Sequence, residues 1–305
     1  MDHWSKRLPL AGLLLAAVFF TSVGVRSLGD TTTAMLVSSF VMFAACLASA
    51  AHLLGLRAAL VFAAIAIALG WFAEQMGASH GWFFGSYDYT DVLGPRVGDV
   101  PLIIPLMWFA LTYMGYVIAN LIIWRAPADG STHLGEALGL SLLTAMIVTA
   151  YDLGADPYMV FVLKAWIMTK TDGAWFGETV QGFVGWMFVS FCIVMVFRLV
   201  VRKLPIRPAT GVDRRHAVLP VLIYAGLMAF QIVAGFPVET RSIAVFAMGF
   251  PVLCALAGWR HWRTHDTTNL GETAYSDKHD TRASGCAPPT PPATGNRYSH
   301  ACSAP

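Results

Sequence analysis

The chain has 305 residues, of which 56% are hydrophobic and only 12% are charged, and its net charge is +2 at pH 7. Soluble globular domains carry about 25% charged residues, so this composition excludes a soluble domain. A net charge so close to zero also gives no sign of a nucleic-acid partner. The sequence therefore predicts an integral membrane protein.

Apolar runs divide most of the chain into segments of membrane length. An α-helix needs about 20 apolar residues to cross the hydrocarbon core. We therefore predict about eight transmembrane helices, at residues 8–25, 34–54, 57–76, 100–124, 134–152, 180–201, 215–235 and 241–260. The basic start at Lys6 and Arg7 also allows the first of them to be a signal peptide. The shorter apolar segment 157–169 is expected to be a half-helix or a re-entrant segment.

The expected fold class is all-α and polytopic, in two parts. Residues 1–262 form the transmembrane helical domain, and residues 263–305 form a cytoplasmic tail. The tail is polar, lacks apolar periodicity and contains four prolines between residues 288 and 292. Such a composition cannot bury enough apolar surface to fold, so the tail is predicted to be disordered.

The distribution of basic residues predicts the orientation of the helices. If the N-terminus is cytoplasmic and segment 157–169 does not cross, 15 of the 20 Lys and Arg residues face the cytoplasm. The other five are Arg26, Arg96, Lys164, Lys170 and Arg241. This bias follows the positive-inside rule, so both termini are predicted to be cytoplasmic, with the chain in the inner membrane of a bacterial cell.

Two polar islands interrupt the apolar pattern, and this topology places both on the outer side. The first runs through residues 74–102, and the second comprises residues 151–157 and 172–178. Carboxylates, glycines and aromatic residues are concentrated in both islands. Because a carboxylate near lipid is costly to bury, the acids of these islands are functional candidates.

An acid beside aromatic rings in an apolar cavity has a definite chemical use. Desolvation keeps the acid protonated, so it can donate a proton. The aromatic faces can then stabilise a carbocation through cation–π attraction. This combination suits the protonation of an alkene. An interfacial aromatic belt would explain the Trp and Tyr residues, but less well the acids that are interleaved with them.

The motifs of the two islands carry a resemblance to a known family. In chain order they are Glu74-x-x-Gly77, Gly81-x-x-Phe84-Gly85-x-Tyr87-x-Tyr89, Leu93-Gly94-Pro95, Val100-Pro101-Leu102-x-x-Pro105-x-x-Trp108, Asp152-x-x-x-Asp156-Pro157, Gly173-x-Trp175-Phe176-Gly177 and Gly185-Trp186. Together they resemble the carotenoid biosynthesis membrane-protein family, which includes the carotenoid 1,2-hydratases. The chain departs from the family pattern after Phe176, where Glu178 adds an acid.

The resemblance implies a hydro-lyase that needs no cofactor. Water would add across the terminal 1,2 double bond of an acyclic ψ-end group and give a tertiary alcohol. The implied partners are a carotenoid substrate in the bilayer, membrane lipids and other carotenoid-pathway enzymes such as a glycosyltransferase. No metal site is predicted, because the cysteines show no CxxC spacing and the histidines form no ligand pair on one helix.

The resemblance also suggests roles for residues of both islands. Glu74 or Asp152 would donate the proton, and Asp156 and Asp88 would position the attacking water. The residues expected to line the substrate cavity are Trp82, Phe84, Tyr87, Tyr89, Trp108, Trp175 and Trp186. Two of the acids have structural alternatives, because Asp156 could cap a helix that begins at Pro157 and Asp88 could cap a turn.

Two other functions remain open from the sequence. In an intramembrane prenyltransferase, Asp88 with Asp91 and Asp152 with Asp156 would hold Mg²⁺ and a diphosphate. That reading requires basic residues for the phosphates, and only Arg96, Lys164 and Lys170 lie nearby in the sequence. A non-enzymatic carrier or transporter of lipophilic pigments is the other alternative, although the predicted spans hold few of the midplane charges typical of transporters.

Overall fold

The structure is a computed structural model that describes residues 3–26, 31–128, 133–170, 173–204, 206, 212 and 214–262. The predicted disordered tail, residues 263–305, lies outside the described residues.

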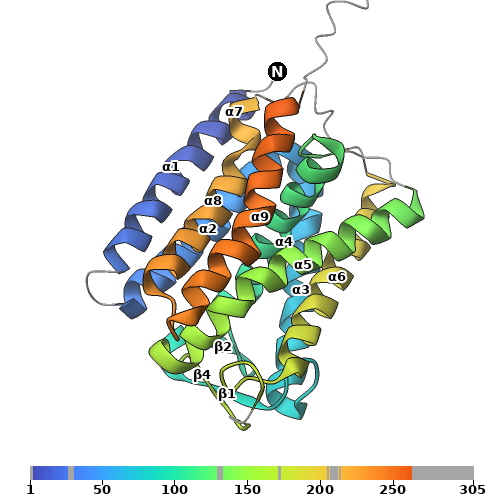
Figure 1. Ribbon diagram of the computed structural model, residues 1–305. Helices are drawn as coiled ribbons and strands as arrows, with labels where there is room; N and C mark the ends of the chain where they lie inside the picture. The colour runs from blue at the N-terminus through green and yellow to red at the C-terminus, as the bar shows by residue number, and fades with distance from the viewer. Residues whose placement is uncertain are drawn as a thin grey trace, which may run out of the picture. The chain divides into compact units, whose positions relative to one another are not determined.

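Long helices make up the described part of the chain. They are α1 (His3–Arg26), α2 (Thr31–Leu54), α3 (Leu56–His80), α4 (Ile103–Trp124), α5 (Leu134–Tyr158), α6 (Val180–Val201), the short α7 (Arg214–Ala217), α8 (Leu219–Ala234) and α9 (Glu239–His261). Figure 1 shows them as a bundle in which successive long helices run in opposite directions. The predicted all-α, polytopic membrane fold is confirmed.

Seven helices of the described residues are long and apolar enough to cross a membrane. The apolar part of α1, Pro9–Ser22, is shorter than a full span. Exposed side chains on the outer helix faces are largely apolar, as Phe246, Phe250 and Leu253 on α9 illustrate with exposed fractions of 77%, 73% and 68%. Such faces need lipid around them.

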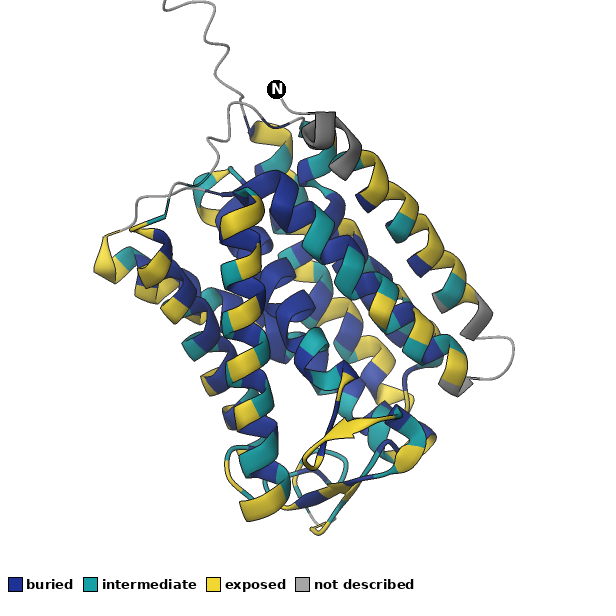
Figure 2. Ribbon diagram, turned by 180° about the vertical axis from the view of Figure 1, so that it is seen from behind, coloured by how far each residue is buried: buried dark blue, intermediate teal, exposed yellow. Residues whose placement is uncertain are grey.

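Helix α4 lies at the centre of the bundle. Of its most apolar stretch 78% is buried, whereas the other six spans are 33% to 50% buried. Figure 2 shows buried residues gathered on the helix faces that point inward. Gly70 lets α3 approach α4, because a Cβ there would come within 2.6 Å of the Trp108 ring. This close approach brings Trp108 beside the next turn of α3.

Segment 157–169 does not form a separate half-helix. Helix α5 continues past Pro157 into a π-helical turn, Met159–Leu163, and β4 (Trp166–Met168) follows. Pro157 has no N–H, so it leaves the carbonyl of Leu153 without its helical donor. The indole of Trp175 donates to that carbonyl at 2.9 Å. Asp156 therefore lies inside α5 and does not cap a new helix.

Short strands join the two polar islands at one end of the bundle (Figure 1). Strand β1 (Tyr87–Tyr89) pairs antiparallel with β4, with Tyr87 opposite Met168 and Tyr89 opposite Trp166. Since β4 returns to the end of α3, segment 157–169 does not cross to the other end. This confirms that the two islands share one side of the bundle.

A second pair of strands completes this end. The 3-10 turn Asp91–Leu93 leads into a hairpin of β2 (Arg96–Val97) and β3 (Val100–Pro101). Gly98 in its turn has φ 65°, and a Cβ there would meet the Gln75 side chain at 2.3 Å. Gln75 also accepts a hydrogen bond from the backbone N–H of Asp99 at 3.0 Å. The hairpin is thereby fixed to the last turns of α3.

Candidate active site

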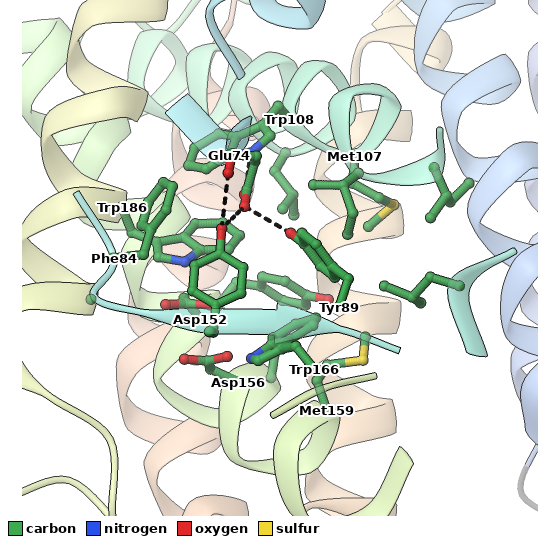
Figure 3. A pocket seen from close by; sticks show the side chains of 18 of the residues that line it. Glu74, Phe84, Tyr89, Met107, Trp108, Asp152, Asp156, Met159, Trp166 and Trp186 are labelled. Carbon is green, nitrogen blue, oxygen red and sulfur yellow. Dashed lines mark hydrogen bonds between the residues drawn. The ribbon is translucent and has the colours of Figure 1, made fainter. Parts of the chain in front are cut away.

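A cavity of about 870 Å³, counted to its open mouth, lies at the strand end of the bundle. Its walls come from α2 to α6 and from the strands (Figure 3). The lining residues are Met35, Ser39, Glu74, Phe84, Tyr87, Tyr89, Leu93, Ile103, Ile104, Met107, Trp108, Leu111, Tyr151, Asp152, Ala155, Asp156, Met159, Trp166, Met168, Gly182 and Trp186. The cavity is thus apolar and aromatic, with three carboxyl groups.

Glu74 is buried near the end of α3, and three side chains donate hydrogen bonds to its carboxyl group. The hydroxyls of Tyr87 and Tyr89 donate to Oε2 at 2.5 and 2.7 Å. The indole N–H of Trp108 donates to Oε1 at 2.9 Å. All three groups donate, so both oxygens of the Glu74 carboxyl group are held as acceptors.

The two tyrosines act only as donors to Glu74. Burial raises the pKa of Tyr87 and Tyr89 well above the usual value, and the negative charge of Glu74 raises it further. Both hydroxyls therefore keep their protons at any physiological pH. Alternate residues of a strand point to opposite faces, so Tyr87 and Tyr89 both turn toward the cavity while Asp88 turns away.

Asp152 and Asp156 approach the cavity from α5, on the side opposite Glu74 (Figure 3). They lie four residues apart, so their side chains share one face of the helix. Asp152 is 2% exposed, and no group of the described residues forms a hydrogen bond with its Oδ2 atom. Asp156 is half-buried, and the side chains of Trp166 and Glu178 lie beside it.

Glu178 lies behind Asp156, outside the cavity lining. It is 2% exposed, and neither carboxyl oxygen receives a hydrogen bond from an N–H or O–H donor of the described residues. Burial and the nearby charge of Asp156 raise the pKa of Glu178 to about 12. Glu178 is therefore protonated at neutral pH and can donate its hydrogen bond to Asp156.

The loop that carries Glu178 is held in a tight turn. Isolated bridges pair Gly173 with Gly177 and Trp175 with Glu178. A Cβ on Gly173 would overlap the backbone of Glu178 at 1.9 Å, so the loop can close only with glycine there. In the closed loop, the carboxyl group of Glu178 lies next to Asp156 of α5.

Aromatic rings form the wall between the acids. The rings of Trp108 and Trp186 stack with their centroids 4.5 Å apart, and Phe84 lies 6.0 Å from Trp108. Helix α6 approaches this wall closely, because a Cβ on Gly185 would meet the carbonyl oxygen of Phe83 at 2.3 Å. The indole and phenyl faces can stabilise a cation formed beside them.

The structure brings together most of the residues expected at the site. Those that line the cavity are Glu74, Phe84, Tyr87, Tyr89, Trp108, Asp152, Asp156 and Trp186. Three others do not line it. Asp88 is exposed on the far face of β1, Trp82 is 54% exposed, and Trp175 caps the carbonyl of Leu153.

Sequence reasoning missed several residues of the site. Tyr151 and Trp166 line the cavity, and Glu178 supports Asp156. Trp166 stood out in the sequence as one of several aromatic residues, but only the pairing of β1 with β4 places it opposite Tyr89. Glu178 was visible as an extra acid, but the sequence held no signal that it faces Asp156.

The two acidic pairs suggested for a prenyltransferase do not come together, because Asp152 and Asp156 line the cavity and Asp88 and Asp91 do not. Asp88 is exposed, and Asp91 points to solvent, where it forms an ion pair with Arg96 at 3.0 Å. Among the described lining residues of the cavity, none is Lys, Arg or His. A diphosphate would therefore meet carboxylates and aromatic rings without a counter-charge.

The fold and site define a polytopic membrane protein with an acidic, aromatic-walled cavity at one end of its bundle. The chain belongs to the carotenoid biosynthesis protein family, whose model matches residues 30–254. It is similar to the bisanhydrobacterioruberin hydratase of Haloarcula japonica, with 29% identity over 164 residues. The alignment covers 53% of this chain and 52% of that relative, so the chain matches about half the relative's length. No solved structure matches the chain.

Proposed function

We propose that this protein is a carotenoid hydratase, which adds water to the terminal 1,2 double bond of an acyclic ψ-end group. One observation carries the proposal: three carboxyl groups with different hydrogen-bonding environments face an aromatic wall in a single cavity. The reaction needs an acid, a means of stabilising a cation and a base that holds water. Family membership and the hydratase relative support the same reaction.

Asp152 is the proton donor in this proposal. Its Oδ2 has no hydrogen-bond partner, so nothing holds that oxygen as an acceptor, and a proton placed there can point into the cavity. Transfer of this proton to the less substituted carbon of the double bond leaves a tertiary cation on the other carbon. Positioned acids of this kind contribute about 10²–10⁴-fold to a rate.

Glu74 and the indoles stabilise the cation. With three donors fixed on it, the Glu74 carboxylate is a preorganised negative charge that needs no rearrangement during the reaction. Trp108 and Trp186 add their ring faces. From the sequence, Glu74 and Asp152 were both candidates for the proton donor. The proposal assigns that role to Asp152 and the electrostatic role to Glu74.

Asp156 holds the water and restores the acid. It lies between Asp152 and the side chains of Trp166 and Glu178, and in its carboxylate form it accepts a proton. The water oxygen bonds to the tertiary carbon, and its released proton passes to Asp156. Since Asp152 lies one turn away, the proton can return to it, and the sum of the steps is one water added.

The location of the protein belongs to the same proposal. We place the chain in the inner membrane of a bacterial cell with the strand end outward and both termini cytoplasmic. Arg57, Arg125, Arg202 and Lys203 lie at the end of the bundle away from the strands, as the positive-inside rule requires of a cytoplasmic face.

The test is hydration of lycopene by the purified protein in H₂¹⁸O. The proposal expects a gain of one water per ψ-end with the label in the new hydroxyl group, in the presence of EDTA and without NAD(P)H, ATP or O₂. In a parallel reaction under ¹⁸O₂ in unlabelled water, label in the hydroxyl group would make the protein an oxygenase. An unchanged substrate, recovered from folded protein, would exclude the hydratase function.

A further inference from the structure

A second cavity, of about 570 Å³, adjoins the candidate active site. The two cavities share six lining residues: Met35, Ser39, Met107, Tyr151, Ala155 and Met159. The first cavity reaches α6 through Trp186, and the second reaches α1 and α8 through Phe19 and Leu227. Helices α6 and α8 stand on opposite flanks of the bundle (Figure 1), so the two cavities together extend across it.

The chemistry of the lining changes from one cavity to the other. All three carboxyl groups line the first cavity, and no Asp, Glu, Lys, Arg or His is among the described residues that line the second. The second is walled mainly by Phe19, Met42, Tyr158, Leu227 and Phe230. Tyr158 and Phe230 meet edge to face, with ring centroids 5.4 Å apart. A ligand that fills both cavities must therefore have one reactive end and a long apolar body.

The shared wall is rich in methionine. Met35, Met107 and Met159 lie between the two cavities, and Met42 lies beyond them. Methionine side chains are flexible and polarisable, so they adapt to an irregular apolar ligand and open or narrow a passage at low cost.

We propose that the second cavity is a subsite for the isoprenoid chain behind the reacting end group. It rests on the proposed hydratase function and specifies its substrate: an extended acyclic polyene whose end lies at Asp152 and whose body passes the methionines toward α8. Burial of this body contributes binding that is equal in the ground state and the transition state. Such uniform binding acts on KM and leaves kcat largely unchanged.

Leu227 offers a direct test, because it is 8% exposed and lines only the second cavity. Leu227→Trp would fill the subsite, whereas Leu222→Trp on the exposed face of the same helix is the matched control. Lycopene and geraniol serve as probes, because both end in the same isopropylidene group but geraniol has no polyene. The kcat/KM ratio of lycopene to geraniol should fall about tenfold or more in Leu227→Trp, mainly through KM, and stay at the wild-type value in the control.

A second measurement, of lycopene binding, tests the subsite independently of the hydration reaction. Lycopene retained by the purified protein, measured by its absorbance, should fall in Leu227→Trp and not in Leu222→Trp. If the wild-type protein hydrates neither probe, the proposed function fails, and retention alone still decides the subsite. The subsite proposal would be overturned if folded Leu227→Trp retained as much lycopene as Leu222→Trp and showed the same kcat/KM ratio of lycopene to geraniol. If that variant does not reach the membrane, Leu227→Phe, which fills the subsite with a smaller ring, replaces it, with the same two readouts and the same expected direction.

Discussion

Asp152 and Asp156 lie one helical turn apart on the same face of α5, but their carboxyl groups have different neighbours. The side chains of Trp166 and Glu178 lie beside Asp156, whereas no donor of the described residues bonds the Oδ2 atom of buried Asp152. Hydrogen bonds to a carboxylate favour the charged form, and their absence in a buried site favours the neutral one. In the proposed function, Asp152 is the acid and Asp156 is the base.

Replacement of the proposed acid should abolish hydration without loss of protein. Asp152→Asn has nearly the same shape and no transferable proton, so turnover should fall by about 10²–10⁴-fold. The abundance of the variant in membranes should equal that of the wild type. Asp88→Asn is the control, because Asp88 is exposed on the outer face of β1 and should retain full activity. Full turnover in Asp152→Asn would move the donor role to another acid.

Glu74→Gln should reduce kcat and leave KM for lycopene nearly unchanged. The amide removes the fixed negative charge, and its NH₂ group would face the donors of Tyr87, Tyr89 or Trp108. Loss of one preorganised electrostatic group costs about 10²–10³-fold in kcat. Steady-state kinetics on folded protein checks this. A change in KM alone would show that Glu74 binds substrate and does not stabilise the cation.

Glu178 should make stability depend on pH. Burial and Asp156 raise its pKa in the folded protein from the ordinary 4.5 to about 12, so between these values the folded state binds the proton and the unfolded state does not. Stability is fully present below about pH 4.5 and declines as pH rises through this window. Glu178→Gln removes the effect, so its thermal midpoint should rise relative to the wild type between about pH 5 and pH 9.

Thermal unfolding of both proteins in detergent at several pH values measures this difference. The two curves should be close at the acidic end and should separate toward the alkaline end, with the variant higher. Parallel curves across the range would contradict the raised pKa. The turnover of Glu178→Gln should also shift its pH profile, because Asp156 loses its protonated neighbour.

Gly70 should be required for the position of Trp108. In Gly70→Ala the new methyl group would lie 2.6 Å from the Trp108 ring, so the ring must move away from Glu74. Overpacking of this kind costs about 1–3 kcal/mol, and the midpoint of thermal unfolding should fall. Gly139→Ala is the matched control, because a Cβ there has no neighbour within 4 Å. Equal stability and activity in the two variants would contradict the tight packing of α3 on α4.

The orientation can be measured with single cysteines in a cysteine-free background. Asp88→Cys at the strand end should react with an impermeant maleimide added to the outside of intact cells. Lys203→Cys, past the end of α6, should react only after the membrane is opened. The reverse pattern would invert the proposed topology but would leave the site geometry unchanged.

The sequence by itself determined the class, the helices and the shared side of the two islands. The reason is that a membrane span depends on the length of a local apolar run, which needs no knowledge of neighbours. The spans that begin at Leu56, Ile103 and Val180 all start within four residues of their predicted positions. The motifs likewise indicated Glu74 and Asp152, because isolated acids in apolar segments are rare.

Tertiary structure alone decided the roles of individual atoms. Trp108 donates to Glu74 across 34 residues, and Glu178 reaches Asp156 only because a closed loop turns it inward. Asp88 was expected in the site and is outside it, because it lies in a strand between two inward tyrosines. Hydrogen-bond partners and cavity walls depend on which helices pack together, and that information is not contained in any local stretch of sequence.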